Sequence, residues 1–417
     1  MELKEEIALY QQLRFEQDGR LKEDLSTLNE SQLKTLLSEL KVEHPSPDEP
    51  DDLDEIIKVS SFDDVRLDVD DIENRIKGAI LGRFAGCLLG VPVENYSIAR
   101  MKEIAKMGDT PFPPTEYWHK VDREDWIQYG VDRRGDYTLP GINAVFVDDD
   151  ITYTILNLIA LKRFGAHYST EDMAKLWLEV LPYACTAEDS ALQELRAGIN
   201  AKEVANNNPF IEWIGAAIRA DAFGYVFAGR PRLAAIAAYN DAYLTHRRNG
   251  IYGEMFLAAA ISFSFSIHPL EAIKKAINYI PKNSRLHKDI DWALSYEGKI
   301  RDFEEARRLI DERFTGMDGV HTNNNMCVIT FATMLGGSSY TDAVSTCVAM
   351  GLDNDCTGAS IGSMFGAYYS LRGVDKKWYA NFNDTVHTYL KGFEKLRLSD
   401  VFCWALDIYA KNLSLLQ

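Results

Sequence analysis

The chain has 417 residues, of which 46% are hydrophobic, and its formal net charge is −18. This length is enough for a large core in one or two domains, and the acidic balance without a basic stripe argues against nucleic-acid binding. The charged N-terminus lacks a secretory core, and the longest apolar run (255–267) is too short to span a bilayer, so no membrane association is expected. Six cysteines without a CxxC pair predict reduced thiols in a cytoplasmic protein, and we expect a monomer.

The acidity is concentrated at the N-terminus, where residues 1–74 hold 22 Asp and Glu but only 8 Lys and Arg. Leucines at helical spacing predict one or two helices over 1–42. The stretch EHPSPDEPDDLDEI (43–56) predicts a Pro-rich acidic linker without regular structure. We therefore expect an acidic helical extension and linker over 1–70, dispensable for the core up to residue 56, and a compact domain over 71–417.

Helical patterns dominate the rest of the chain, whereas alternating strand patterns and internal repeats are scarce. The sequence therefore predicts an all-α orthogonal bundle of roughly a dozen helices. The expected helices cover residues 75–90, 149–163, 170–181, 189–203, 211–227, 231–244, 251–267, 270–279, 303–313, 324–335, 340–351, 357–371 and 382–397.

Two of these helices carry glycines spaced by four residues, which places the glycines on one face of each helix. Because glycine costs about 1 kcal/mol relative to alanine inside a helix, such stripes indicate close packing of backbones. We expect the two helices to lie together at the centre, so that the segments at their ends converge. The stripes are Gly78, Gly82, Gly86 and Gly90 in one helix, and Gly358, Gly362 and Gly366 in the other.

Two acidic clusters, about two hundred residues apart, each precede a long apolar helix. They contain Asp148, Asp149 and Asp150 in the first case, and Asp353 and Asp355 in the second. Aspartate is a favoured N-cap, so one such cluster is most simply a helix cap. Five carboxylates at two helix starts would repel one another unless cations lay between them, and Mg²⁺ or Mn²⁺ prefer such oxygen ligands.

Other candidate residues are less distinctive. Glu94 follows the first glycine helix, where Pro92 is expected to end the helix and leave Glu94 in a loop among apolar residues. His246 lies near the end of one helix, and Tyr252 and Gly253 lie at the start of the next. A lone histidine such as His246 is more often structural than catalytic.

The loop TGMDGVHTNNN (315–325) contains His321 and Asn323 ahead of a helix. Backbone N–H groups in such a loop can hold an anion such as a phosphate, although most loops of this composition bind nothing.

Together these motifs resemble the ADP-ribosylglycohydrolase family over roughly residues 75–400. The matching segments are GAILGRFAGCLLGVPVE, the aspartate cluster running into a helix, DAYLTHRRNGIYGEMF and GLDNDCTGASIGSMFGAYY. The resemblance implies an all-α fold with two divalent metal ions, Mg²⁺ or Mn²⁺. It also implies a hydrolase that cleaves the ribose C1 bond of an ADP-ribosylated protein side chain or small molecule.

The resemblance also implies roles for individual residues. Glu94 matches the glutamate near the scissile bond, and Asp149 and Asp150 match paired aspartates that ligate the metals and take part in catalysis. The implied substrate-binding residues are His246, Tyr252, Gly253, His321 and Asn323, and the implied metal ligands are Asp148, Asp149, Asp150, Asp353, Asp355 and Cys356.

Three positions depart from the family pattern. Asp148 stands where a metal-binding threonine is usual, unless the register shifts so that Val147 takes that place. Cys356 stands where a threonine or serine ligand is usual, and Cys87 replaces an aspartate common after the helix glycines. The alternatives to the main hypothesis are a metal-dependent hydrolase of another ribosylated or phosphorylated metabolite, or a non-catalytic scaffold of the family.

Overall fold

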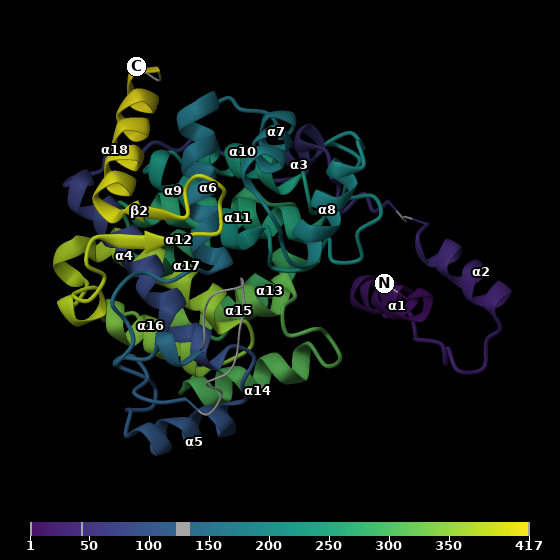
Figure 1. Ribbon diagram of the computed structural model, residues 1–417, viewed down its shortest axis with the longest axis horizontal. Coiled ribbons are helices and arrows are strands. Elements are labelled where there is room, and N and C mark those ends of the chain that lie inside the picture. The colour runs from purple at the N-terminus through teal and green to yellow at the C-terminus, as the bar shows by residue number, and fades with distance from the viewer. Residues whose placement is uncertain (1, 43–44, 122–133, 416–417) are drawn as a thin grey trace.

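The computed structural model describes residues 2–42, 45–121 and 134–415, and these form a helical protein with one small sheet (Figure 1). The N-terminal part contains α1 (Leu3–Asp18), α2 (Glu30–Leu40), α3 (Leu53–Val59), α4 (Ile72–Gly90) and α5 (Ile98–Gly108). The middle part contains α6 (Asp149–Phe164), α7 (Thr170–Val180), α8 (Thr186–Arg196), α9 (Asp221–Val226), α10 (Pro231–Ala242), α11 (Asn249–Ser264), α12 (Pro269–Ala276), α13 (Arg285–Leu294) and α14 (Phe303–Arg313).

The C-terminal part contains α15 (Thr322–Leu335), α16 (Tyr340–Ala349), α17 (Asn354–Gly373) and α18 (Leu398–Leu415). Strands β1 (Thr385–His387) and β2 (Lys395–Arg397) pair antiparallel between α17 and α18. Short 3-10 helices cover Val91–Val93, Arg134–Tyr137, Ala217–Arg219, Ile277–Tyr279 and Lys376–Trp378. The predicted all-α class is therefore confirmed.

The glycine stripes form a seam in which α4 and α17 run together through the core. Gly78 faces Gly366, Gly82 faces Gly362, and Gly86 faces Gly358. A Cβ atom at any of these three α4 positions would lie less than 3.0 Å from a backbone atom of α17. The helices lie too close for any side chain between them, and their contact brings the C-terminal end of α4 beside the N-terminal end of α17.

The last glycine of the stripe contacts the second acidic cluster directly. A Cβ atom at Gly90 would lie less than 3.0 Å from Cα and N of Asp355. The expectation that the ends of the two glycine helices converge is therefore met, because Glu94 follows α4 and Asp353 precedes α17.

Several predicted elements differ from the structure. Residues 382–397 form β1, a turn and β2 rather than a helix, and 211–227 begins with turns and the 3-10 helix Ala217–Arg219 before the short helix α9. Four helices were not predicted, namely α3, α5, α13 and α18. In segment 382–397, left-handed backbone at Asn383 and Asp384 precludes a continuous helix.

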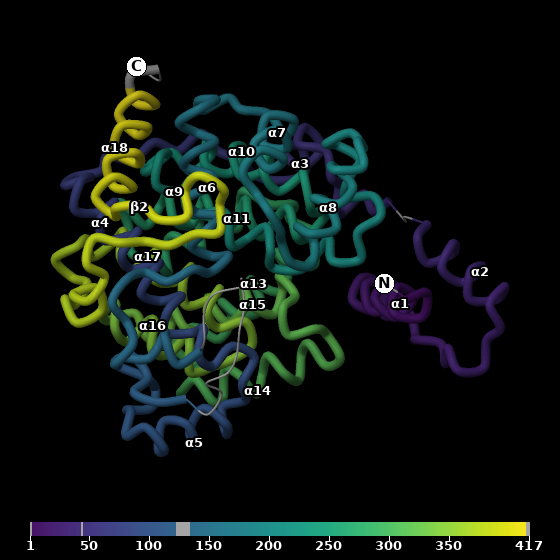
Figure 2. The backbone as a smooth tube through the Cα atoms, in the orientation of Figure 1, coloured from purple at the N-terminus to yellow at the C-terminus, as the bar shows by residue number. Residues whose placement is uncertain are grey.

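Residues 43 and 44 of the predicted linker over 43–56 lie outside the described residues, and the described part contains the start of a helix and a buried residue. Helix α3 begins inside it because the Asp52 side chain accepts hydrogen bonds from the backbone N–H groups of Asp54 and Glu55. Glu49 is only 5% exposed. The linker is therefore not a detached tether, although Figure 2 shows α1 and α2 lying to one side of the main body.

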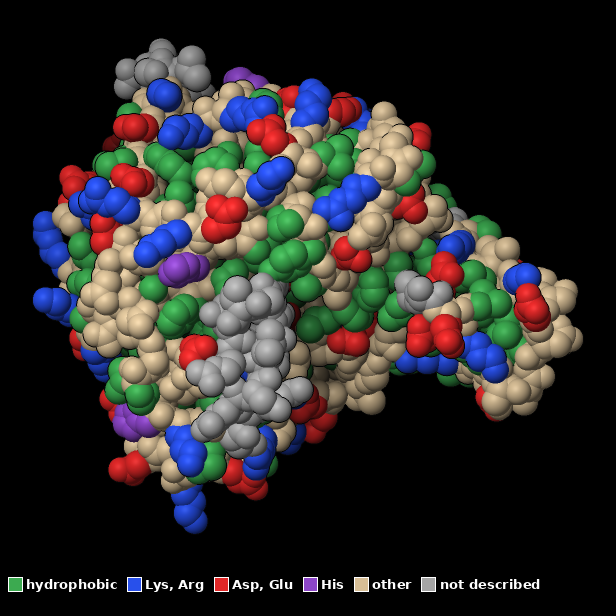
Figure 3. All heavy atoms as spheres, viewed as in Figure 1, with side chains coloured by type: hydrophobic (Ala, Val, Ile, Leu, Met, Phe, Trp, Pro, Cys, Tyr) green, Lys and Arg blue, Asp and Glu red, His purple; other side chains and the backbone are tan. Residues whose placement is uncertain are grey.

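Residues 72–93 are long and apolar enough to cross a membrane, but 94% of an apolar stretch of 18 residues within them is buried inside the protein. The seam with α17 accounts for this apolar composition. On the face drawn in Figure 3, Lys and Arg side chains are interspersed with Asp, Glu and apolar side chains.

Candidate metal centre and pocket

The first acidic cluster is positioned by the start of α6. Asp148 is the N-cap of this helix, and its Oδ1 accepts a hydrogen bond from Asp150 N at 3.0 Å. Both side chains are buried. Asp148 is therefore a helix cap, as the simpler interpretation predicts, and it also faces other acidic groups, which a cap does not require.

The second cluster differs because Asp353, the N-cap of α17, makes no capping hydrogen bond with its side chain. Asp353 and Asp355 are both 5% exposed. Capping therefore does not explain the carboxylate of Asp353, and its orientation needs another reason.

The two clusters converge around the end of α4. Among the described residues, side chains with possible metal-ligand atoms form three groups. Within each group, the ligand atoms all lie within 4.8 Å of one another. The groups are Cys87 with Asp148 and Asp150, Asp150 with Asp355 and Cys356, and Glu94 with Asp353 and Asp355. Five of the six implied metal ligands therefore come together, and Asp149 belongs to none of the three groups.

Glu94 lies at the rim of this cluster, with 24% of its side chain exposed. It follows the 3-10 helix Val91–Val93, so α4 ends before the glutamate as Pro92 predicts. Asn95 N donates to Leu352 O at 3.0 Å, which ties the loop to the segment before Asp353. Arg134 Nη2 lies 3.7 Å from Glu94 Oε2.

Arg83 is a buried cation beneath the centre. Its Nη2 lies 3.0 Å from Asp150 Oδ1, and its Nη1 lies 2.7 Å from Asp221 Oδ2. Its Nε donates to Thr154 Oγ1 at 2.6 Å. An arginine inside the apolar α4 pattern could have signalled a buried acidic partner, because such a charge needs one.

Glu94 and the buried aspartates of the two clusters have raised pKa values. Burial and the charge of Asp355 raise the pKa of Glu94 to about 8, although Arg134 opposes the shift. Burial raises the pKa of Asp150 to about 7 against the opposing charge of Arg83, and burial with the charge of Asp150 raises that of Asp355 to about 7. Burial and neighbouring aspartates raise the pKa values of Asp148 and Asp353 well above their usual range.

This donor set suits divalent metal ions. Asp150 Oδ2 and Asp355 Oδ1 are buried and have no hydrogen-bond partner among the described residues. Clustered, desolvated carboxylate oxygens of this kind fit hard cations such as Mg²⁺ and Mn²⁺. The thiol of Cys356 is softer than the threonine or serine oxygen that the family resemblance led us to expect, and the thiol of Cys87 is softer than the expected aspartate oxygen.

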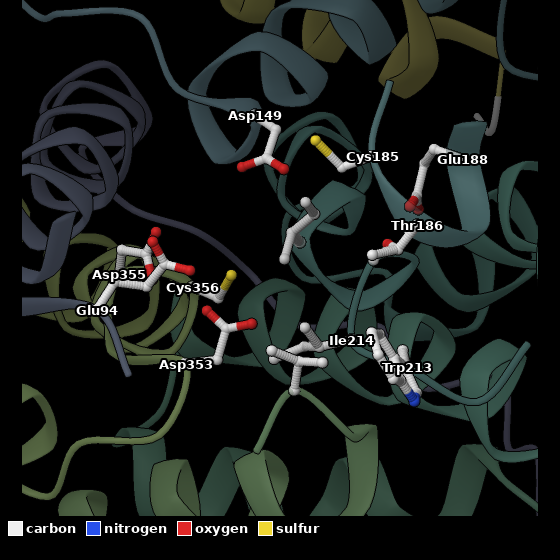
Figure 4. Close-up of a pocket in the computed structure, with 13 residues that line it drawn as sticks. Glu94, Asp149, Cys185, Thr186, Glu188, Trp213, Ile214, Asp353, Asp355 and Cys356 are labelled. Atoms are coloured by element: carbon white, nitrogen blue, oxygen red, sulfur yellow. The ribbon is translucent and has the colours of Figure 1, made fainter. Parts of the chain in front are cut away.

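A pocket of about 220 Å³ opens over the centre. In Figure 4, Glu94, Asp353, Asp355 and Cys356 lie on one side of it, and Asp149 and Cys185 lie across from them. Asp149 therefore reaches the same space as the metal groups without belonging to one. The other lining residues are Thr186, Glu188, Trp213, Ile214, Gly215, Ile218 and Val320.

Sequence reasoning missed most of these pocket residues. Glu188 is the most notable, because it is 3% exposed and burial raises its pKa to about 7 against the charge of Arg219. Arg219 Nη1 donates to its Oε1 at 2.5 Å. A glutamate in the first turn of α8 gives no sequence signal that separates it from ordinary surface residues.

The five implied substrate-binding residues do not line the pocket. His246 is buried, and its Nδ1 lies 2.6 Å from Thr245 Oγ1. Tyr252 is buried, and its hydroxyl donates to Pro50 O at 2.5 Å. Gly253 packs against the Thr322 side chain.

His321 and Asn323 lie at the start of α15, where the sequence suggested an anion site. His321 Nδ1 accepts from Asn323 N at 3.1 Å, and Asn323 Nδ2 donates to Asp289 Oδ2 at 2.7 Å. Asp318 N donates to Glu16 Oε1 at 2.9 Å. These donors of the expected anion loop already have partners within the chain.

Comparison with known proteins agrees with this architecture. One solved structure, described as an ADP-ribosylglycohydrolase-related protein complex, aligns with a TM-score of 0.50 and 18% identity. The alignment covers 81% of this chain and 98% of that chain, and at this identity it supports the fold alone. No curated protein matches the sequence.

The family comparison covers most of the chain. The model of the ADP-ribosylglycohydrolase family matches residues 68–405, which include the glycine seam, both acidic clusters and Glu94. With its helical fold and its convergent carboxylates, the chain belongs to the ADP-ribosylglycohydrolase family of glycosidase-type hydrolases.

Proposed function

We propose that the pocket hydrolyses the glycosidic bond at ribose C1 of an ADP-ribosylated protein side chain or small molecule. The observation that carries this proposal is the convergence of buried carboxylates from α6, α17 and the α4 loop at a pocket, in a chain of this family. Two divalent ions, Mg²⁺ or Mn²⁺, would be held among Asp148, Asp150, Asp353, Asp355 and Cys356, with Asp149 facing them across the pocket.

Bound metal ions of this kind orient substrate oxygens and lower the pKa of a coordinated water. The chain's own residues supply the remaining requirements. Glu94 lies at the rim with a raised pKa, so its carboxyl group can exchange a proton with water or with the leaving group near neutral pH. Departure of the leaving group generates positive charge at ribose C1, which the acidic pocket favours.

The aromatic and aliphatic side chains of the pocket would contribute to substrate binding and not to metal binding. In Figure 4, Trp213 and Ile214 lie across the pocket from Glu94 and Asp355. Val320 also lines the pocket, and the three side chains would present apolar surface to a bound molecule. Such surface excludes water and orients a sugar or base without competing for the metal ions.

One feature favours the alternative hypothesis, a metal-dependent hydrolase of another ribosylated or phosphorylated metabolite, and specifically a ribosylated substrate that lacks a diphosphate. The pocket lining within the described residues includes no Lys or Arg, so no lining cation is present to pair with phosphate oxygens. Two described arginines approach acids of the lining: Arg219 donates to Glu188 at 2.5 Å, and Arg134 lies 3.7 Å from Glu94.

A substrate panel separates the two candidates. Metal-stripped protein, reloaded with Mg²⁺ or Mn²⁺, would be incubated with ADP-ribosylated arginine, an ADP-ribosylated serine peptide and ribonucleosides without phosphates. Release of ADP-ribose that depends on metal and on Glu94 supports the main proposal. Cleavage of the nucleosides alone supports the alternative, and no cleavage of any member contradicts both.

A further inference from the structure

One wall of the pocket is made by two loop segments that are bonded to each other. Ile214 N donates to Val320 O at 2.9 Å, and Thr322 N donates to Glu212 O at 3.1 Å. Thr322 Oγ1 also donates to Trp213 O at 3.0 Å. We call these segments, residues 211–215 and 316–322, the pocket wall. Helices and the glycine seam fix the opposite, acidic side, so the wall is the part of the pocket with the least regular structure.

Helix α1, from outside the region that matches the family, contacts this wall along one face. Glu16 Oε1 accepts a hydrogen bond from Asp318 N at 2.9 Å, and Gln12 Nε2 donates to Gly316 O at 3.0 Å. Phe15 covers Gly316, where an added Cβ atom would lie 2.9 Å from the ring. Three side chains within little more than one turn of α1, those of Gln12, Phe15 and Glu16, therefore contact the 316–322 segment.

The other wall segment is held from below by Glu212, which is fully buried. Its carboxylate accepts from Gln17 Nε2 of α1 at 2.7 Å and from Asn249 Nδ2 at 2.9 Å. Arg285 Nη2 pairs with the same carboxylate. Glu212 directly precedes Trp213 and Ile214, so any shift of its backbone moves two residues of the pocket lining.

Glu49 completes the same network from the segment that follows α2. Its Oε1 accepts from Arg285 N at 2.8 Å and from Asn249 Nδ2 at 3.0 Å, and its Oε2 pairs with Arg248. The flanking residues are also bonded, since Arg248 N donates to Asp51 Oδ1 at 2.6 Å. Residues 49–51 are thereby anchored to the helices that support the wall.

We propose that α1 and Glu49 are positioning elements of the active site, which hold the pocket wall against the bound substrate without contacting it. Charge-assisted hydrogen bonds and ion pairs of this kind fix geometry as well as contributing energy. Here they hold two loop segments in place, and such segments are otherwise among the least stable parts of a fold. The positioning role does not depend on the identity of the substrate, but the choice of ADP-ribose as a probe rests on the proposed function.

The test compares matched pairs of variants in the full-length protein. Glu16→Ala with Gln17→Ala removes two contacts to the wall, whereas Ser38→Ala with Glu39→Ala changes two exposed neighbours on α2. Glu49→Gln removes the anchoring charge, whereas Asp48→Asn changes the exposed acid beside it. The second pair keeps the test valid if the first double variant fails to fold.

Two measurements report how firmly the pocket wall is held. Backbone hydrogen exchange of residues 211–215 and 316–322 should become about tenfold faster in the test variants, with α4 and α17 unchanged as internal references. With Mg²⁺ present, ADP-ribose should bind about tenfold more weakly, while Mn²⁺ affinity stays within twofold of the wild type.

Unchanged exchange of the wall in both test variants would overturn the proposal, whatever happens to ADP-ribose. Equal effects in the control variants would overturn it too. If the wild-type protein does not bind ADP-ribose, the proposed function fails, but the exchange measurement still decides whether α1 and Glu49 hold the wall.

Discussion

The chain contains two buried groups of acids that balance charge in opposite ways. Behind the pocket wall, Glu49 and Glu212 are paired with two arginines, Arg248 and Arg285. Burial opposes ionisation of Glu212, yet the charges of Arg285 and Arg248 lower its pKa to about 2. This wall cluster is neutralised by the chain itself.

The pocket cluster, formed by Glu94, Asp148, Asp150, Asp353 and Asp355, lacks such a balance. Arg83 pairs with Asp150 but also with Asp221, and Arg134 lies 3.7 Å from Glu94. Each acid of the pocket cluster has a raised pKa. Burial is common to both clusters, and the number of paired cations is what distinguishes them.

The largest effect is expected on metal binding when two acids of the pocket cluster are removed. Asp150→Ala with Asp355→Ala should abolish binding of Mg²⁺ or Mn²⁺ to metal-stripped protein, because Asp150 and Asp355 both belong to the group that joins α6 to α17. Titration calorimetry measures this. Glu212→Gln should keep the wild-type affinity, since the wall cluster is already balanced. Metal binding that survives in the double variant would contradict the conclusion that the pocket cluster, unlike the wall cluster, needs metal ions to balance its charge.

The next effect concerns turnover. Glu94→Gln should lower kcat about 10²- to 10⁴-fold, the usual range for loss of a proton-transferring group, while metal and ADP-ribose affinities stay within a few-fold. The control is Glu103→Gln on the exposed face of α5, which should leave kcat unchanged. Normal turnover in Glu94→Gln would remove Glu94 from the chemistry.

The two clusters should also give pH dependences of opposite sign. The folded-state pKa of Glu212 is depressed, so its stabilising contribution is present above pH 4.5 and is lost as the pH falls toward 2. The raised pKa values of Asp150 and Asp355 mean that metal-free protein should lose stability as the pH rises from 4 to 7.

Thermal unfolding of metal-stripped protein at several pH values tests this contrast. Tm should fall from pH 5 to pH 7, and added Mn²⁺ should reverse the fall by binding the ionised carboxylates. Asp150→Asn with Asp355→Asn should flatten that slope, and Glu212→Gln should leave it in place. A Tm that rises over this range without metal would show that the pocket acids are not destabilising.

The smallest effects concern the two unusual positions. Asp148→Thr should weaken metal affinity about tenfold by removing one charge from the cluster, whereas Cys356→Thr should keep or improve activity with Mg²⁺, because a hydroxyl is a harder ligand than a thiol. Metal-dependence curves of the two variants measure this. Unchanged affinity in Asp148→Thr would favour the register in which Val147 takes the threonine position.

Periodicity predicted much of this fold because most helices bury one apolar side, and glycine spacing predicted the seam. The convergence of Asp150 and Asp355 follows from that seam, which is why the acidic clusters were recognisable as one site. Glu188, Trp213 and Val320 were missed because their pocket positions depend on loop paths that no local pattern encodes. The role of Glu49 was missed because the partners of a buried acid, here Arg248 and Arg285, lie about two hundred residues away.

The seam between α4 and α17 also limits which amino acids the chain can accept far from its pocket. Gly78 lies three helical turns before Gly90, yet a methyl group at either position would force the same pair of backbones apart. Damage at Gly78 would reach Asp355 as a displacement of α17, without touching the pocket itself. Loss-of-function substitutions in this protein should therefore include a line of glycine positions extending well away from the carboxylates that they hold in place.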